Sequence, residues 1–223
     1  MTDHLRPTAP IAGLAVLPGD PGRALVLAQD LLEGPLMANH ARGLWGYTAK
    51  TRAGVELTVQ STGLGGPSIA IVLEELASLG VRRAIRLGTC RSIAAGLEAG
   101  ALAVAVAALP APGEGEAGPA KPDEELSEAL LRAGEGALLP VTIAETSRYY
   151  DPDATTRDEA RLAAGAQAVD LATATMFEVA ARLGVEVASA LVIARAGDRA
   201  LSDEEVETAS LRLGRLASAA LRA

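Results

Sequence analysis

Apolar residues along this chain form both short strand-like runs and stripes with helical spacing. The clearest example of the two together lies between residues 59 and 89. Two short apolar segments, each followed by small polar residues, flank a stretch with apolar residues at the helical spacing of three and four. Pro67 can begin that helix and Gly80 can end it. The helical stripe is Ile69, Val72, Leu73, Leu76 and Leu79. The pattern predicts a βαβ unit whose two parallel strands lie side by side.

The rest of the chain continues this alternation of strand and helix patterns. Strands are predicted at 14–17, 47–52, 55–61, 101–107, 138–144, 168–171 and 187–194. Helices are predicted after Arg23 to about residue 32, at 124–133, at 173–183, and from the Ser202 and Glu205 capping box to the end. Residues 109–123, rich in Pro, Gly and Glu, are expected to form a mobile surface loop. We therefore expect a single α/β domain over 1–223, with three α/β/α layers.

Composition narrows the class of protein. Hydrophobic residues make up 49% of the 223 residues, which is enough for one large core and argues against disorder. The net charge of −8 argues against a nucleic-acid or anionic membrane partner. The single cysteine, Cys90, excludes an internal disulfide and is typical of a reducing compartment. Because no signal segment is found and the apolar run at 101–112 is too short to cross a bilayer, we expect a soluble cytoplasmic protein.

Glycines and arginines gather where three of the predicted strands end. The turn after the first strand contains Gly19, Gly22 and Arg23, and it precedes a helix whose free N–H groups favour an anion. A glycine-rich segment follows at 61–68, and Arg86 lies between apolar residues of the next strand. An unpaired buried guanidinium is costly, so Arg86 points to an anionic ligand, with phosphate as the first candidate. Each segment alone is also compatible with an ordinary turn between a strand and a helix.

Taken together, these motifs resemble the nucleoside phosphorylase family, which includes hexameric bacterial purine nucleoside phosphorylase and uridine phosphorylase. The matching segments, in order, are LPGDPGRA, NHARGLWGYT, STGLGGPS, RLGT and VDLATATMF, followed by an Asp after the penultimate strand. The resemblance covers essentially the whole chain. It implies a central twisted mixed sheet flanked by helices, and a homo-oligomer, commonly a dimer-based hexamer. It also implies reversible phosphorolysis, with inorganic phosphate as co-substrate and neither a cofactor nor a metal.

Carried over position by position, the resemblance implies roles for particular residues. The phosphate-binding residues would be Gly19, Arg23, Arg42, Arg86 and Thr89. The nucleoside-binding residues would be His4, Cys90, Arg91, Tyr149, Asp170, Leu171 and Ala172. Arg86 would be catalytic together with Asp198, the general acid at N7 of the departing purine, whose pKa partial burial would raise. Arg42 and His4 would reach the site of a neighbouring subunit, His4 at the ribose 5′-hydroxyl.

Two positions depart from the family pattern. Ala172 occupies the position of a glutamate that grips the ribose 2′ and 3′ hydroxyls, and Asp170 lies two residues before it on a shorter side chain. Charge-assisted hydrogen bonds contribute about 1.5–3 kcal/mol each, so losing two could lower activity on ribosides several hundredfold or more. Arg91 stands where the family usually has a small residue beside the base. A long cation there would narrow the pocket or recruit an additional anionic group.

Alternatives stay open for single residues and for the whole protein. His4 is also compatible with a frayed terminus, Tyr149 with a surface loop and Asp198 with a turn. For the whole chain, a purine nucleoside phosphorylase is the leading hypothesis, and uridine is an alternative substrate. A nucleosidase that uses water, and a non-catalytic binder of phosphate or a phosphorylated nucleoside, are the other hypotheses. Retained arginines argue against the nucleosidase, because water needs no cationic site.

Overall fold

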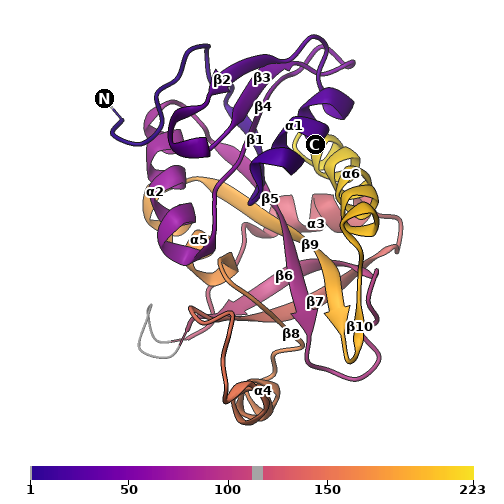
Figure 1. Cartoon of the computed structure of the whole chain (residues 1–223). Coiled ribbons are helices and arrows are strands. Elements are labelled where there is room, and N and C mark those ends of the chain that lie inside the picture. Colours follow the sequence, from indigo (N-terminus) through magenta and orange to yellow (C-terminus); the bar gives the residue numbers. More distant parts are fainter. Residues whose placement is uncertain (1, 112–117) are drawn as a thin grey trace.

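The computed structural model describes residues 2–111 and 118–223, in which strands and helices alternate along the chain (Figure 1). The strands are β1 (Leu14–Pro18), β2 (Leu36–Asn39), β3 (Gly46–Lys50), β4 (Glu56–Gln60), β5 (Arg83–Ser92), β6 (Leu102–Leu109), β7 (Leu138–Glu145), β8 (Ala168–Asp170), β9 (Glu186–Ala196) and β10 (Arg199–Ala200). The helices are α1 (Pro21–Leu31), the 3₁₀ turn η1 (Ala41–Gly43), α2 (Gly65–Ser78), α3 (Glu124–Ala133), α4 (Ala154–Ala163), α5 (Thr173–Leu183) and α6 (Asp203–Ala220).

The described strands form one mixed sheet in the order β10-β9-β6-β7-β8-β5-β1-β4-β3-β2. The ten-residue β5 also pairs with β9 in parallel, while it pairs with β8 in antiparallel orientation. Because β5 contacts both ends of the β9-β6-β7-β8 series, this half of the sheet closes on itself. The expected central mixed sheet is confirmed, and its closure brings the carboxyl end of β5 beside β8 and β9.

The predicted βαβ unit is present, but its strands are not neighbours. β4 and β5 both pair in parallel with β1, which lies between them. The expectation that the two strands lie side by side is therefore wrong, because the α2 crossover passes over one strand. The loop after β4 still meets the turn after β1, since the Gly63 amide donates to the Gly19 carbonyl at 3.0 Å.

Helices cover both faces of the sheet, which confirms the three layers. On one face α2 packs against α5, with Leu73 and Phe177 fully buried between them and the sheet. On the other face α6 packs against α1 and α3, around Leu27 and Leu213. Helix α4 belongs to neither helical layer and lies at one end of the half of the sheet that closes on itself (Figure 1). None of its residues is buried.

Local signals explain most helix boundaries. The Asp20 side chain accepts from the Arg23 amide and begins α1. The predicted capping box at α6 is confirmed, with both the Ser202 and the Glu205 side chains bonded to backbone. Gly184 ends α5 in the left-handed conformation, with a φ of 66°. Helix α2 begins two residues earlier than predicted, with Pro67 in its first turn.

Four elements were not predicted: β2, η1, α4 and β10. Helix α4 lies within and beyond the polar stretch at 145–156, where few apolar residues gave a helical stripe. Of the loop predicted at 109–123, residues 112–117 lie outside the described part, and Ala120 forms an isolated antiparallel bridge to Ala108. No helix within residues 2–111 and 118–223 combines the length and apolar character needed to cross a membrane.

Candidate active site

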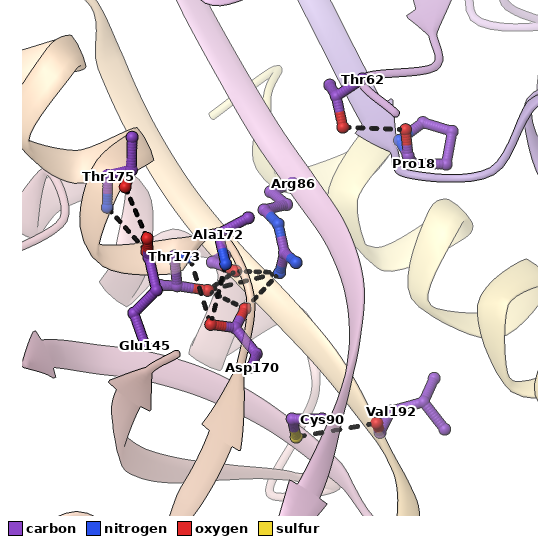
Figure 2. Close-up of polar contacts among 11 residues, drawn as sticks. Pro18, Thr62, Arg86, Cys90, Glu145, Asp170, Ala172, Thr173, Thr175 and Val192 are labelled. Atoms are coloured by element: carbon purple, nitrogen blue, oxygen red, sulfur yellow. Dashed lines mark hydrogen bonds and ion pairs between the residues drawn. The ribbon is translucent and has the colours of Figure 1, made fainter. Parts of the chain in front are cut away.

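Arg86 on β5 is buried, and its guanidinium pairs with an acidic side chain of β8. Its Nη1 atom lies 3.0 Å from Oδ2 of Asp170, whose side chain has no exposed surface. The same Nη1 is 3.3 Å from the Thr173 hydroxyl and 3.5 Å from the Ser189 hydroxyl. Figure 2 shows these groups converging from β5, β8 and the start of α5. The cation that the sequence placed in an apolar strand is therefore partly neutralised within the chain.

Gly88 makes room for this arrangement. A Cβ at Gly88 would overlap Nη1 of Arg86 and would lie 2.7 Å from a methyl group of Leu191. Glycine is therefore needed two residues after the arginine, because the Arg86 guanidinium occupies the space that a side chain at position 88 would fill. This is a close-packing requirement, because the φ of Gly88 is not in the left-handed region.

Arg23 is a second cation close to Arg86, and it lacks a full set of partners. Its Nη1 is buried without a hydrogen-bond partner among the described residues. Burial lowers the pKa of the Arg23 guanidinium, nearby Asp20 raises it, and the charge of Arg86 lowers it further. A buried, unpartnered N–H group is costly, and two neighbouring cations repel each other. An anion bound beside Gly19 would relieve both costs, since a Cβ placed on Gly19 would lie 3.8 Å from Nη2 of Arg23.

Arg42 lies on η1 and His4 lies before β1, outside the elements that carry Arg23 and Arg86. Arg42 is exposed on η1, with a positive φ of 57°. The backbone amide and Nδ1 of His4 both lie 2.9 Å from the Glu75 carboxylate on α2. The terminal segment is thus anchored rather than frayed, because Glu75 also accepts from the amides of Asp3 and Leu5. Roles for Arg42 and His4 in a neighbouring subunit stay predictions.

Beyond Thr89, a cavity of about 570 Å³ opens at the carboxyl ends of β5 and β8. Its lining residues come from the strands β5, β8, β9 and β10, and from α4 together with the segment that precedes it. Six residues predicted from the sequence line it: Thr89, Cys90, Arg91, Tyr149, Asp170 and Leu171. The fold therefore brings together residues that are up to 82 positions apart, in a cavity large enough for a small-molecule ligand.

Ala172 and Asp170 lie at the start of α5, next to the cavity. Ala172 is the N-cap of α5 and is buried. The Asp170 carboxylate accepts from the amides of Ala172 and Thr173, and its Oδ2 also accepts from the Thr173 hydroxyl at 2.6 Å. With Arg86 as a further partner, Asp170 is fully engaged within the protein. It therefore does not replace the missing glutamate as a grip for sugar hydroxyls.

Arg91, the second departure, is held by α4. Its Nη1 and Nη2 lie 2.7 and 3.1 Å from the two carboxylate oxygens of Asp158, and Arg161 lies 2.9 Å from the same carboxylate. Burial raises the pKa of Asp158, but hydrogen bonds from Arg91 and Arg161 lower it by more, and the net shift is downward. The sequence did not reveal this contact because α4 was not predicted. Arg91 thus forms one wall of the cavity and ties α4 to β5.

Asp198 and the tyrosine pair lie at the periphery. Asp198 is exposed in the two-residue turn between β9 and β10 and does not line the cavity, whereas Arg195 of β9 does. The partial burial expected for a general acid is absent in the isolated chain, and the role of Asp198 stays a prediction. Tyr149 and Tyr150 form an edge-to-face pair with ring centroids 5.0 Å apart, and both line the cavity.

Sequence reasoning missed Glu145, a buried carboxylate at the end of β7. It accepts from the amide of Thr175 at 2.8 Å and from the Thr175 hydroxyl at 2.5 Å (Figure 2). A side chain of β7 thus caps the first turn of α5. Burial raises the pKa of Glu145, and the charge of Asp170 adds to the rise. A Cβ at Gly66 would lie 2.8 Å from its Oε1. The one available signal was a glutamate that ends an apolar strand.

Comparison with known proteins agrees with this geometry. The family model described as Phosphorylase superfamily matches residues 14–223. The chain is 33% identical over 195 residues to a "Purine nucleoside phosphorylase DeoD-type" from Caldanaerobacter subterraneus subsp. tengcongensis, covering 82% of each protein. A protein of the same name from Geobacillus kaustophilus is 33% identical over 210 residues, which cover 89% of this chain and 86% of the relative. One from Clostridium novyi is 49% identical over 84 residues, which cover 37% and 36%.

The match spans nearly the whole chain, including α1 with Arg23, β5 with Arg86 and the strands that form the cavity. This chain belongs to the phosphorylase superfamily.

Proposed function

We propose that this protein is a nucleoside phosphorylase that cleaves the N-glycosidic bond of a purine nucleoside, giving a free base and a pentose 1-phosphate. Inorganic phosphate is the co-substrate, and no cofactor is required. The observation that carries the proposal is the buried, unpartnered Nη1 of Arg23 beside Arg86. Two neighbouring cations, one in the first turn of α1 and one on β5, form a site for a doubly charged anion. Relatives named as purine nucleoside phosphorylases favour a purine over uridine, which remains the alternative substrate.

The chemistry follows from the order of groups along β5. Arg23, Arg86 and the Thr89 hydroxyl hold phosphate, and the nucleoside occupies the cavity that Thr89 and Asp170, the partner of Arg86, line. A phosphate oxygen forms a bond to the anomeric carbon while the bond from that carbon to the base nitrogen breaks. The electron pair of the broken bond goes to the base, where Asp198 offsets the charge by giving a proton or hydrogen bond to N7. The bound phosphate stabilises the positive charge that develops on the sugar.

Two other activities are weighed against this one. A nucleosidase would need no buried guanidinium without a partner, so Arg23 argues against water as the nucleophile. A binder without turnover is favoured by Ala172 and by the engagement of Asp170, because neither grips the sugar hydroxyls. Loss of that grip weakens riboside binding but leaves the phosphate site and the cavity in place, so we place catalysis first.

A homo-oligomer, a hexamer built from dimers, forms part of the proposal. Exposed apolar residues lie on the edge strand β2 and just before β3, which flank Arg42 in sequence, and also at α2. They are Leu36, Met37, Trp45, Leu64 and Ile71. Ile71 lies on α2, and Leu64 is the residue immediately before that helix. A partner covering this surface would bring its own Arg42 and His4 toward the site. A cytoplasmic location, inferred from the lone Cys90, likewise stays a prediction.

One experiment separates the hypotheses. The purified protein is incubated with a panel of purine and pyrimidine nucleosides, with and without inorganic phosphate, and free base is measured by chromatography. Release that requires phosphate supports the proposal. Release without phosphate supports the nucleosidase, and binding without release supports the non-catalytic binder. Size-exclusion chromatography with light scattering tests the oligomer independently, since a monomer at micromolar concentration would exclude shared sites.

A further inference from the structure

The cavity beyond Thr89 holds more positive charge than its acidic residues neutralise. Four arginines line it: Arg91, Arg148, Arg161 and Arg195. Arg91 and Arg161 share the single carboxylate of Asp158, which leaves one positive charge between them. The side chains of Arg148 and Arg195 have neither an ion pair nor a hydrogen-bond partner within residues 2–111 and 118–223.

The acidic residues of the cavity do not offset these charges. Asp170 is paired with Arg86, and Asp151 lies 2.7 Å from Nε of Arg157, a residue that does not line the cavity. The negative charge of each of these two carboxylates is therefore already neutralised by an arginine that does not line the cavity. An excess of three positive charges remains around one cavity, in a chain whose net charge is −8. Such a local excess in an acidic protein points to an anionic part of a ligand.

Arg91 and Arg195 stand well beyond Arg86 along the sheet. Arg91 is five residues beyond Arg86 on β5, and Arg195 pairs with Arg91 on the neighbouring β9. At about 3.3 Å per strand residue, their backbones lie roughly 16 Å from that of Arg86. Tyr149 and Tyr150 line the same cavity beside Arg148 and offer aromatic surfaces to a planar ring. This distance fits the far end of a nucleoside whose sugar lies next to phosphate.

We propose that the ligand carries a negative charge on its base, and that Arg148 and Arg195 recognise it. The inference rests on the proposed function for the direction of the ligand, with phosphate at Arg86 and the base toward Tyr149. The matching substrate class is a purine nucleoside with an acidic, oxo-substituted base. When the N-glycosidic bond breaks, its electron pair goes to a base that is already negatively charged, and the same guanidinium groups stabilise that base.

The test compares xanthosine, whose base loses a proton in the neutral range, with guanosine, which has nearly the same shape and a neutral base. Phosphorolysis is measured at pH 7.5 for the wild type, Arg148→Gln and Arg195→Gln. Arg132→Gln, which removes an exposed arginine of α3, is the matched control. We expect kcat/KM for xanthosine to exceed that for guanosine about tenfold. Each cavity variant should reduce this ratio threefold to fivefold, as for an exposed charge pair, and the control should not.

A third substrate, guanosine 5′-monophosphate, places the charge on the sugar. Preference for it over guanosine, without preference for xanthosine, would overturn the proposal, as would equal ratios in all variants. If no nucleoside is cleaved, titration calorimetry with xanthosine and guanosine separates the two claims. Tighter binding of xanthosine that depends on Arg148 and Arg195 supports the anionic-base cavity while the proposed activity fails. Equal binding of both nucleosides overturns the anionic base itself.

Discussion

Nη1 of Arg86 lies 3.0 Å from Oδ2 of Asp170, and the Asp170 side chain is completely buried. The pair joins β5 to the end of β8, just before α5 begins. A buried ion pair of this kind contributes little net stability but fixes geometry, because removing one partner leaves an unpaired buried charge. We therefore expect Asp170 to position Arg86 rather than to contact the sugar.

Replacing Arg86 with alanine should abolish phosphate-dependent turnover and should also destabilise the fold. The unpaired Asp170 carboxylate is expected to cost about 3–5 kcal/mol of unfolding free energy. The double variant Arg86→Ala with Asp170→Asn separates the two effects. Urea unfolding should show that it regains much of the lost stability, whereas a phosphorolysis assay should show no regained activity. Unchanged phosphorolysis in Arg86→Ala would reject the assignment of this arginine.

Gly88→Ala should displace the Arg86 guanidinium without removing its charge. The added Cβ overlaps Nη1 of Arg86 and approaches Leu191, so the arginine must leave its position beside Asp170. We expect the KM for phosphate to rise about tenfold or more, with a smaller change in KM for the nucleoside. Gly13→Ala is the control, because its virtual Cβ meets its nearest atom at an ordinary 3.7 Å. If both variants keep the wild-type KM for phosphate, Arg86 does not hold that anion.

Ala172→Glu should restore a grip on the sugar hydroxyls and raise activity on ribosides. The new carboxylate stands at the N-terminus of α5, where the helix dipole favours negative charge, next to the lining residue Leu171. Two regained charge-assisted hydrogen bonds correspond to a gain on the order of a hundredfold, reduced by repulsion from Asp170. A 2′-deoxyriboside, which offers one hydroxyl fewer, should gain less. Kinetics that do not improve for either sugar would mean that the cavity is shaped around another ligand.

Glu145→Gln should change how stability depends on pH. Burial raises the folded-state pKa of Glu145 above the unfolded value, so its charged form destabilises the fold at neutral pH. That cost disappears as the pH falls through the raised pKa, because the group then takes up a proton in the folded state. The variant should thus be stabilised relative to the wild type more at pH 7 than at pH 4.5.

Urea unfolding at the two pH values measures this difference. Glu128→Gln, whose side chain on α3 is 59% exposed, is the control and should show a smaller pH-dependent difference. A stability difference between Glu145→Gln and the wild type that is the same at both pH values would show that Glu145 does not titrate with a raised pKa.

Much of the fold was predictable because its signals are local. The stripe from Ile69 to Leu76 forms the buried face of α2, and the Ser202 capping box begins α6. Helix α4 was missed because its face is not buried, so its sequence carries no apolar stripe. The edge strands β2 and β10 have only four and two residues, which is too short for an alternation of apolar and polar positions to stand out.

The sequence by itself determined the alternating elements, the family resemblance and the residue types near the site. Only the tertiary structure decided what those residues do. It paired Arg86 with Asp170, tied Arg91 to Asp158, left Asp198 in an exposed turn, and brought Arg148 and Arg195 to one cavity. The physical reason is that electrostatic partnership depends on distance in space. Strand order, and the closure of β5 onto β8 and β9, set those distances independently of local sequence pattern.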